Sequence, residues 1–187
     1  MIYNSDLIFD AKTLRNLSLQ DIEDYKHRPK NKIHIVLDRV YGAYNIGSAF
    51  RIADSINAEK VWIVSGNSDV ASPKHKIVQK ASMNTCQLVD WQVVDSVFQI
   101  QNYLPEYFSL VIEKSDKGKN KFKNELLSIF NEKPLLLTVG NESLGVDESW
   151  IRHADGVLSL PMYGANNSMN VINALAIASY KVLEMVE

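Results

Sequence analysis

Side chains that could hold a ligand recur in three glycine-bearing segments of this sequence, each of which follows an apolar run. The polar members are Asn45 and Arg51 in the first segment, Glu142 in the second, and Ser168 and Asn170 in the third. The apolar runs before them are Ile33–Leu37, Leu135–Val139 and Val157–Leu160. In open α/β sheets, ligands bind beyond the carboxyl ends of strands and at helix N-termini. The pattern therefore predicts one site assembled from the three segments.

Ordinary structural roles remain open for the same residues. Asn45 would be the N-cap of a helix that begins near Ile46, and Arg51 would be an exposed arginine on that helix. Glu142 would be a carboxylate at the start of a short helix. Ser168 would cap the long final helix, because its hydroxyl can accept a hydrogen bond from an unpaired amide of the first turn.

Several well-known kinds of site are absent from the sequence. No G-x-G-x-x-G follows the first strand, and there is neither a G-x-x-x-x-G-K-[ST] phosphate loop nor a G-x-S-x-G nucleophile elbow. The histidines lack the spacing of metal ligands; they are His27, His34, His75 and His153. We therefore expect no metal ion and no dinucleotide cofactor.

In order and spacing, the three segments together resemble the motifs of the SpoU-type (TrmH-like) RNA ribose methyltransferases of the SPOUT superfamily. The first motif is N-x-G-x-x-x-R, here residues 45–51, and the second is G-x-E-x-x-G, here residues 140–145. The third is Leu-Pro-Met at 160–162, followed by Ser-Met-Asn-Val at 168–171. The resemblance covers roughly residues 33–187.

The resemblance implies an α/β fold, a parallel sheet with helices on both faces and a C-terminal trefoil knot. It also implies a homodimer whose second copy completes the active site, and S-adenosylmethionine as the methyl donor. By similarity, the donor lies against a set of residues at the strand ends: Val139, Gly140, Leu160, Met162, Ser168 and Met169.

The implied reaction is methyl transfer to a ribose 2′-hydroxyl of transfer or ribosomal RNA. By similarity Arg51 lies at that oxygen, where a permanently protonated guanidinium stabilises the forming alkoxide. The residues implied to orient Arg51 and the loops are Asn45, Glu142, Ser168 and Asn170. A base acceptor, a non-catalytic RNA-binding or assembly protein that keeps the fold, and a small-molecule nucleotide-binding protein remain as alternatives.

Composition is that of an ordinary globular chain, with 187 residues, 46% apolar and 22% charged. No apolar run approaches the roughly 20 residues that span a bilayer, and the N-terminus lacks the pattern of a signal peptide. The single cysteine, Cys86, is expected in the core and indicates a reducing compartment. We therefore expect a cytoplasmic protein with no membrane partner, built from an extension at 1–30 and a methyltransferase domain at 31–187.

The net charge of −2 leaves room for a local basic face that binds RNA. One candidate stretch lies just before the first strand and contains Lys26, His27, Arg28, Lys30 and Lys32. The other surrounds Gly118 and contains Lys114, Lys117, Lys119, Lys121 and Lys123.

Periodicity and turn signals place the remaining elements. Strands are expected at 61–64, 85–89 and 110–112, and helices at 18–25, 46–56, 75–80, 93–103, 122–130 and 148–152. The final helix is rich in small residues, so we expect another stretch of backbone to lie close to it; these residues are Ala174, Ala176, Ala178 and Ser179.

Overall fold

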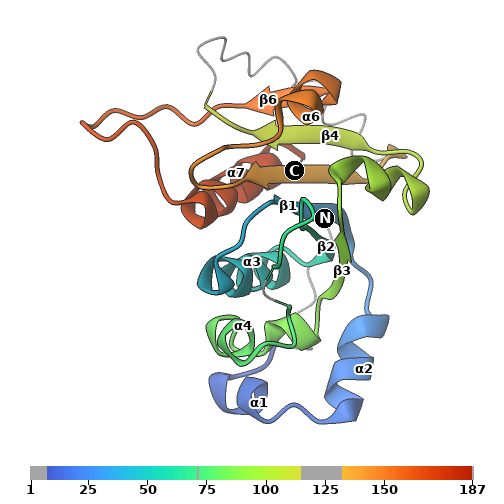
Figure 1. Ribbon diagram of the computed structural model, residues 1–187. Coiled ribbons are helices and arrows are strands. Elements are labelled where there is room, and N and C mark those ends of the chain that lie inside the picture. The colour runs from blue at the N-terminus through green and yellow to red at the C-terminus, as the bar shows by residue number, and fades with distance from the viewer. Residues whose placement is uncertain (1–7, 71, 115–131, 187) are drawn as a thin grey trace.

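The computed structural model describes residues 8–70, 72–114 and 132–186. In these residues a parallel sheet of six strands runs in the order β3-β2-β1-β5-β4-β6 (Figure 1). The strands are β1 (Asn31–Asp38), β2 (Ala58–Val64), β3 (Asp90–Val94), β4 (Phe108–Ile112), β5 (Leu135–Gly140) and β6 (Gly156–Leu158). The helices are α1 (Ala11–Arg15), α2 (Leu19–His27), α3 (Ala43–Ser55), α4 (Lys76–Ala81), α6 (Glu148–His153) and α7 (Val171–Val186), with 3₁₀ helices η2 (Thr85–Gln87) and η3 (Val97–Asn102).

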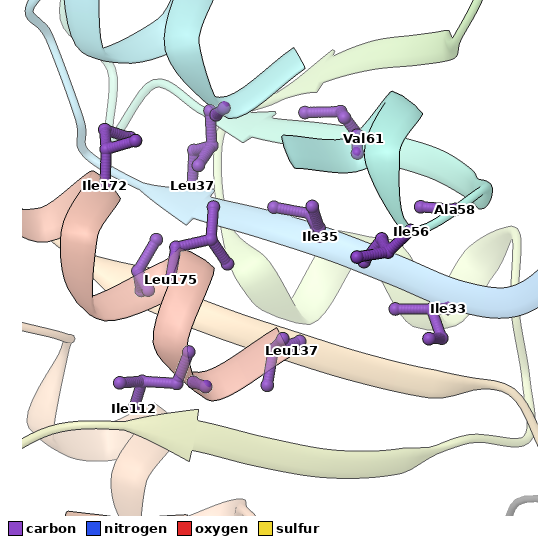
Figure 2. Packing of buried hydrophobic residues seen from close by; sticks show 14 of the residues in the cluster. Ile33, Ile35, Leu37, Ile56, Ala58, Val61, Ile112, Leu137, Ile172 and Leu175 are labelled. Carbon is purple, nitrogen blue, oxygen red and sulfur yellow. The ribbon is translucent and has the colours of Figure 1, made fainter. Parts of the chain in front are cut away.

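The central strands are apolar along almost their whole length because helices cover both faces of the sheet. On one face, α3, α4 and α7 pack over Ile35 and Leu37 of β1 and Leu137 of β5, and Leu175 of α7 points into this cluster (Figure 2). On the other face, η3 and α6 pack over the alternate residues of the same strands, such as Val36. The predicted parallel sheet with helices on both faces is confirmed.

The strand order changes direction between β1 and β5. From β1 the chain proceeds outward through β2 and β3, whereas β5, β4 and β6 lie on the other side of β1. The two central strands end together, because Asp38 of β1 is paired with Gly140 of β5. In open parallel sheets, the crevice beyond such a switch point is where ligands bind.

Residues 8–30 precede the sheet and contact α3 and the turn that follows α4. Ser18 and Asp21 form a capping box at the start of α2, which confirms the helix expected at 18–25. Tyr25 of α2 is buried, and its hydroxyl donates a hydrogen bond to Asp54 of α3. The side-chain amide of Asn84 donates to the carbonyl of Leu14 (2.9 Å).

Two predictions between β2 and β4 are wrong. The strand expected at 85–89 is instead η2, because Met83 and Asn84 adopt left-handed backbone conformations that turn the chain. The helix expected at 93–103 starts as the end of β3, where Val94 pairs with Val64, and continues as η3. The expected helix at 122–130 lies outside the described residues.

The single cysteine is buried, as expected for a core residue. In the described ranges, no helix is long and apolar enough to cross a bilayer.

Candidate active site

The three motif segments meet beyond the carboxyl ends of β1 and β5, where their polar side chains bond to one another. The side-chain amide of Asn170 donates to Asn45 Oδ1 (3.3 Å), and Asn45 Nδ2 donates to Glu142 Oε1. These residues come from the segments after β6, β1 and β5, respectively. The sequence prediction that the segments converge is therefore confirmed for these side chains.

The N-cap roles that the sequence left open for Asn45 and Ser168 are both wrong, and the actual helix starts explain this contact. Helix α3 begins at Ala43 with Gly42 as its N-cap, so Asn45 lies inside the first turn and its side chain is available for Glu142. The final helix begins at Val171, and Asn170 Oδ1 accepts the hydrogen bond from the Ile172 N–H (2.9 Å). Ser168 lies before that cap, and its N–H donates to Asn166 Oδ1 (3.3 Å).

The segment after β5 is held against the end of β1. Its Asn141 side chain donates to the carbonyl of Arg39 (2.9 Å) and accepts from the N–H of Leu144 (3.0 Å). The buried Asp38 carboxylate accepts from the Asp147 N–H (2.7 Å), and it raises the pKa of Arg39 through direct hydrogen bonds. These contacts fix the loop that carries Glu142.

The motif glycines are sites of close approach. A Cβ on Gly140 would lie 2.2 Å from the carbonyl carbon of Gly145, and Gly145 itself has a φ of +69°. A Cβ on Gly47 would lie 2.5 Å from Cβ of Ala81, so glycine allows α3 to pack tightly on α4. L-residues other than glycine rarely adopt positive φ, and a Cβ does not fit at such separations.

A cavity of about 570 Å³ opens beside the Glu142 loop, between the ends of β4 and β5 and the segment before α7. All the residues that the sequence predicts at the donor line it: Val139, Gly140, Leu160, Met162, Ser168 and Met169. Three carboxylates line the same cavity with one lysine, namely Glu113, Glu142, Glu148 and Lys114. Sequence reasoning missed Glu113, although a carboxylate directly after an apolar strand is the signal that Glu142 also gives.

Arg51 is not part of this cavity. It is exposed on α3 and lies six residues after Asn45, which places it about 9 Å farther along the helix axis. The structure thus brings Asn45, Glu142 and Asn170 together but leaves the guanidinium outside the pocket of its own chain.

The SpoU rRNA Methylase family model matches residues 32–180. The chain belongs to this family. The chain is also similar to the 23S rRNA (uridine(2479)-2′-O)-methyltransferase of Streptomyces viridochromogenes, with 25% identity over 153 residues, or 80% of this chain. The 23S rRNA (guanosine(2553)-2′-O)-methyltransferase RlmP of Bacillus subtilis is 26% identical over 172 residues, covering 86% of this chain and 64% of RlmP. This chain spans 51% of the length of the Streptomyces relative.

Solved structures of SpoU methyltransferases share the fold. The AdoMet complex of AviRb from Streptomyces viridochromogenes aligns with a TM-score of 0.69 at 20% identity, covering 86% of this chain and 63% of AviRb. The TrmH/SpoU tRNA modifying enzyme of A. aeolicus aligns with a TM-score of 0.69 at 20% identity, covering 94% of this chain and 81% of that enzyme.

The basic residues of this SpoU family member that lie before and at the start of β1 are only partly available for a ligand. Lys26 pairs with Asp90 (3.1 Å), and the Arg28 guanidinium and Lys30 ammonium lie 3.5 and 3.6 Å from the centre of the Tyr25 ring. Burial lowers the pKa of Lys30 to about 8. Lys32 is exposed. Their contact with RNA stays a prediction, and of the second basic stretch only Lys114 lies within the described residues.

Within the described residues, no three His, Cys, Asp or Glu side chains are grouped so that they could hold a metal ion.

Proposed function

We propose that this chain is an S-adenosylmethionine-dependent RNA methyltransferase that modifies a ribose 2′-hydroxyl of ribosomal or transfer RNA. The observation that carries the proposal is the hydrogen-bonded chain Asn170–Asn45–Glu142 at the rim of the cavity. It joins all three motifs of the SpoU family at one place. The names of the relatives, which are 2′-O-methyltransferases of 23S rRNA, support the choice of acceptor.

The chemistry of the cavity fits the donor. Its lining carries more carboxylates than ammonium groups, which suits a ligand with a sulfonium and an ammonium group and does not suit a nucleotide phosphate. Gly140 and Gly145 let the segment after β5 close tightly on itself and on Glu113, and this segment forms one wall of the cavity. When bound, the donor supplies an electrophilic methyl carbon, which bonds to the 2′-oxygen as the carbon–sulfur bond breaks and its electron pair stays on sulfur.

The residues of the chain would then position and stabilise the reacting groups. The Asn45 amide holds the Glu142 carboxylate, and Asn170 in turn holds Asn45, so the first turn of α3 is fixed relative to the cavity. Arg51 stabilises the negative charge that develops on the 2′-oxygen, because a guanidinium stays protonated throughout. The hydroxyl proton passes to the neighbouring phosphate or to water.

A homodimer is part of this proposal. Arg51 is exposed and lies outside the cavity of its own chain, which supports a role at the cavity of a second copy. The C-terminal trefoil knot is likewise proposed from the family resemblance. Ala174 of α7 lines the cavity and Ala178 is fully buried, which supports close passage of α7 against neighbouring backbone.

RNA would approach over the basic residues before and at the start of β1, of which Lys32 and Lys26 offer the most exposed charge. We place the reaction in the cytoplasm, where ribosomal and transfer RNA are found and where the single thiol of Cys86 stays reduced.

Titration calorimetry with S-adenosylmethionine tests the donor assignment. We expect saturable binding at one site per chain. A Met162→Trp variant, which fills the cavity with a larger side chain, should lose it while its RNA binding is retained. RNA binding by the wild type without any donor binding would overturn the proposal in favour of a non-catalytic RNA-binding protein.

A further inference from the structure

Glu113 lies in the wall of the cavity, immediately after β4. Its N–H donates to the carbonyl of Leu158 at the end of β6 (3.3 Å), so its backbone belongs to the sheet edge rather than to a free loop. The residue is half-buried, and the cavity lining includes it. The motifs assign residues to donor contact or to the orientation of Arg51, and Glu113 belongs to neither set.

The carboxylate of Glu113 is held in place by backbone amides. One oxygen, Oε1, accepts from the Lys114 N–H (2.9 Å), and the other, Oε2, accepts from the Val146 N–H (3.0 Å). The second bond reaches across to the end of the Glu142 loop. The carboxylate of Glu113 is therefore held in one position in the cavity wall.

Gly145 leaves room for this carboxylate. A Cβ on Gly145 would lie 2.6 Å from Glu113 Oε2, well inside van der Waals contact. The glycine that ends the second motif thus serves two purposes, since it adopts a φ of +69° and it admits the carboxylate to the cavity wall.

We propose that Glu113 is a specificity-determining residue that makes the cavity prefer S-adenosylmethionine over the by-product S-adenosylhomocysteine, whose sulfur carries no charge. This inference rests on the proposed function. S-adenosylmethionine and S-adenosylhomocysteine share their adenosine and amino-acid groups and differ by one methyl group and the sulfonium charge. A fixed carboxylate beside a partly desolvated ligand attracts the positively charged sulfur of S-adenosylmethionine and not the uncharged sulfur of S-adenosylhomocysteine. This attraction is strong where water is excluded, and salt screens it only weakly there.

The other carboxylates of the lining are less suited to this role. Glu142 is exposed, whereas Glu113 is half-buried, and the Glu142 carboxylate already bonds to the Asn45 side chain. The Glu148 side chain is 89% exposed and pairs with Arg152 (3.5 Å). Its charge is therefore screened by solvent. A cavity that releases the neutral by-product readily is free sooner for the next donor, which matters wherever product release limits turnover.

Calorimetry with both ligands tests the inference on the ligand-free full chain. For the wild type we expect tighter binding of S-adenosylmethionine than of S-adenosylhomocysteine. In Glu113→Gln, which keeps the shape and an acceptor oxygen but loses the charge, the ratio of the two affinities should fall by about tenfold. Glu148→Gln is the matched control and should change the ratio much less.

Two further arms separate charge from shape. An analogue with a protonated amine in place of the sulfonium should follow the donor, binding the wild type better than Glu113→Gln. Glu113→Asp retains the charge and should retain most of the preference. An unchanged ratio in Glu113→Gln overturns the inference, and so does an equal fall in Glu113→Asp, which would make loop geometry the cause. If the wild type binds neither ligand, the proposed function itself fails.

Discussion

Asn45 and Glu142 are 97 positions apart in the chain, yet the side-chain amide of one donates a hydrogen bond to the carboxylate of the other. The contact exists because β1 and β5 are adjacent parallel strands that end together at Asp38 and Gly140. Each residue follows its strand by a few positions, so the sheet register determines that they meet. This bond links the helix that carries Arg51 to the wall of the cavity.

Placing a second carboxylate at this contact should damage the site. In Asn45→Asp, two carboxylates would face each other, and we expect a loss of methylation of roughly 10- to 100-fold. The free energy of unfolding should also fall by about 1–2 kcal/mol. Methylation rates and urea unfolding measure the two effects.

A paired substitution provides the control for that experiment. Asn45→Asp combined with Glu142→Gln restores one carboxylate opposite one amide, with donor and acceptor exchanged. We expect the double variant to recover stability relative to Asn45→Asp alone. Strictly additive losses would mean that the two side chains do not interact in solution.

Gly47 in the first motif should tolerate no side chain. In Gly47→Ala the new Cβ would lie 2.5 Å from Cβ of Ala81 and 2.8 Å from the carbonyl oxygen of Val78. We expect α3 and α4 to be forced apart, at a cost of about 1–3 kcal/mol in the free energy of unfolding. Gly164→Ala is the control, because nothing lies within 4 Å of a Cβ there. Equal stability of the two variants would show that the helices pack less closely than described.

The sequence predicts the parts of this arrangement that depend on neighbouring residues, and it predicts less well the parts that depend on residues far apart in the chain. The runs Ile33–Leu37 and Leu135–Val139 identify β1 and β5, since strands covered on both faces are mostly apolar; each run contains one buried polar residue, His34 or Thr138. The segment 85–89 is also largely buried, and the sequence therefore predicts a strand there, but its residues 85–87 form the 3₁₀ helix η2. Burial alone does not distinguish a short strand from a tight turn.

The candidate site was predictable in its membership and not in its contacts. Motif spacing identified Asn45, Glu142 and Asn170, but local capping rules assigned Asn45 and Ser168 to helix ends. Helix α3 begins three residues earlier than Ile46, and Asn170 rather than Ser168 caps α7. Glu113 has no motif of its own, and its role depends on Val146, which only the folded sheet brings near.

Lys30 should make stability depend on pH. Burial lowers its pKa to about 8, below the ordinary lysine value of 10.5, so between these pH values the unfolded chain binds the proton that the folded chain has lost. Stability should therefore rise with pH across this window and be level, with respect to Lys30, below about pH 8. Lys30→Met should flatten the rise and stabilise the chain at neutral pH by about 1–2 kcal/mol after allowance for solvent screening. Unfolding curves of both proteins at several pH values provide the measurement, and a parallel rise in the variant would contradict it.

The exposed lysines Lys26, in α2, and Lys32, at the start of β1, should contribute to RNA binding through phosphate contacts. We expect Lys26→Gln combined with Lys32→Gln to weaken binding and to reduce the slope of log affinity against log salt by about 0.7–0.9 for each lost contact. Lys74→Gln, an exposed lysine outside this stretch, is the control. An unchanged slope in the double variant would remove these residues from the RNA interface.

The most direct test of the whole account is the product formed on unmodified RNA by the wild type and by Arg51→Ala. The RNA is digested to nucleosides and analysed by mass spectrometry. We expect the wild type to produce a 2′-O-methylated nucleoside and Arg51→Ala to be at least about 100-fold slower, with donor and RNA binding retained. A rate for Arg51→Ala near that of the wild type, or a methyl group found on a base, would contradict the account.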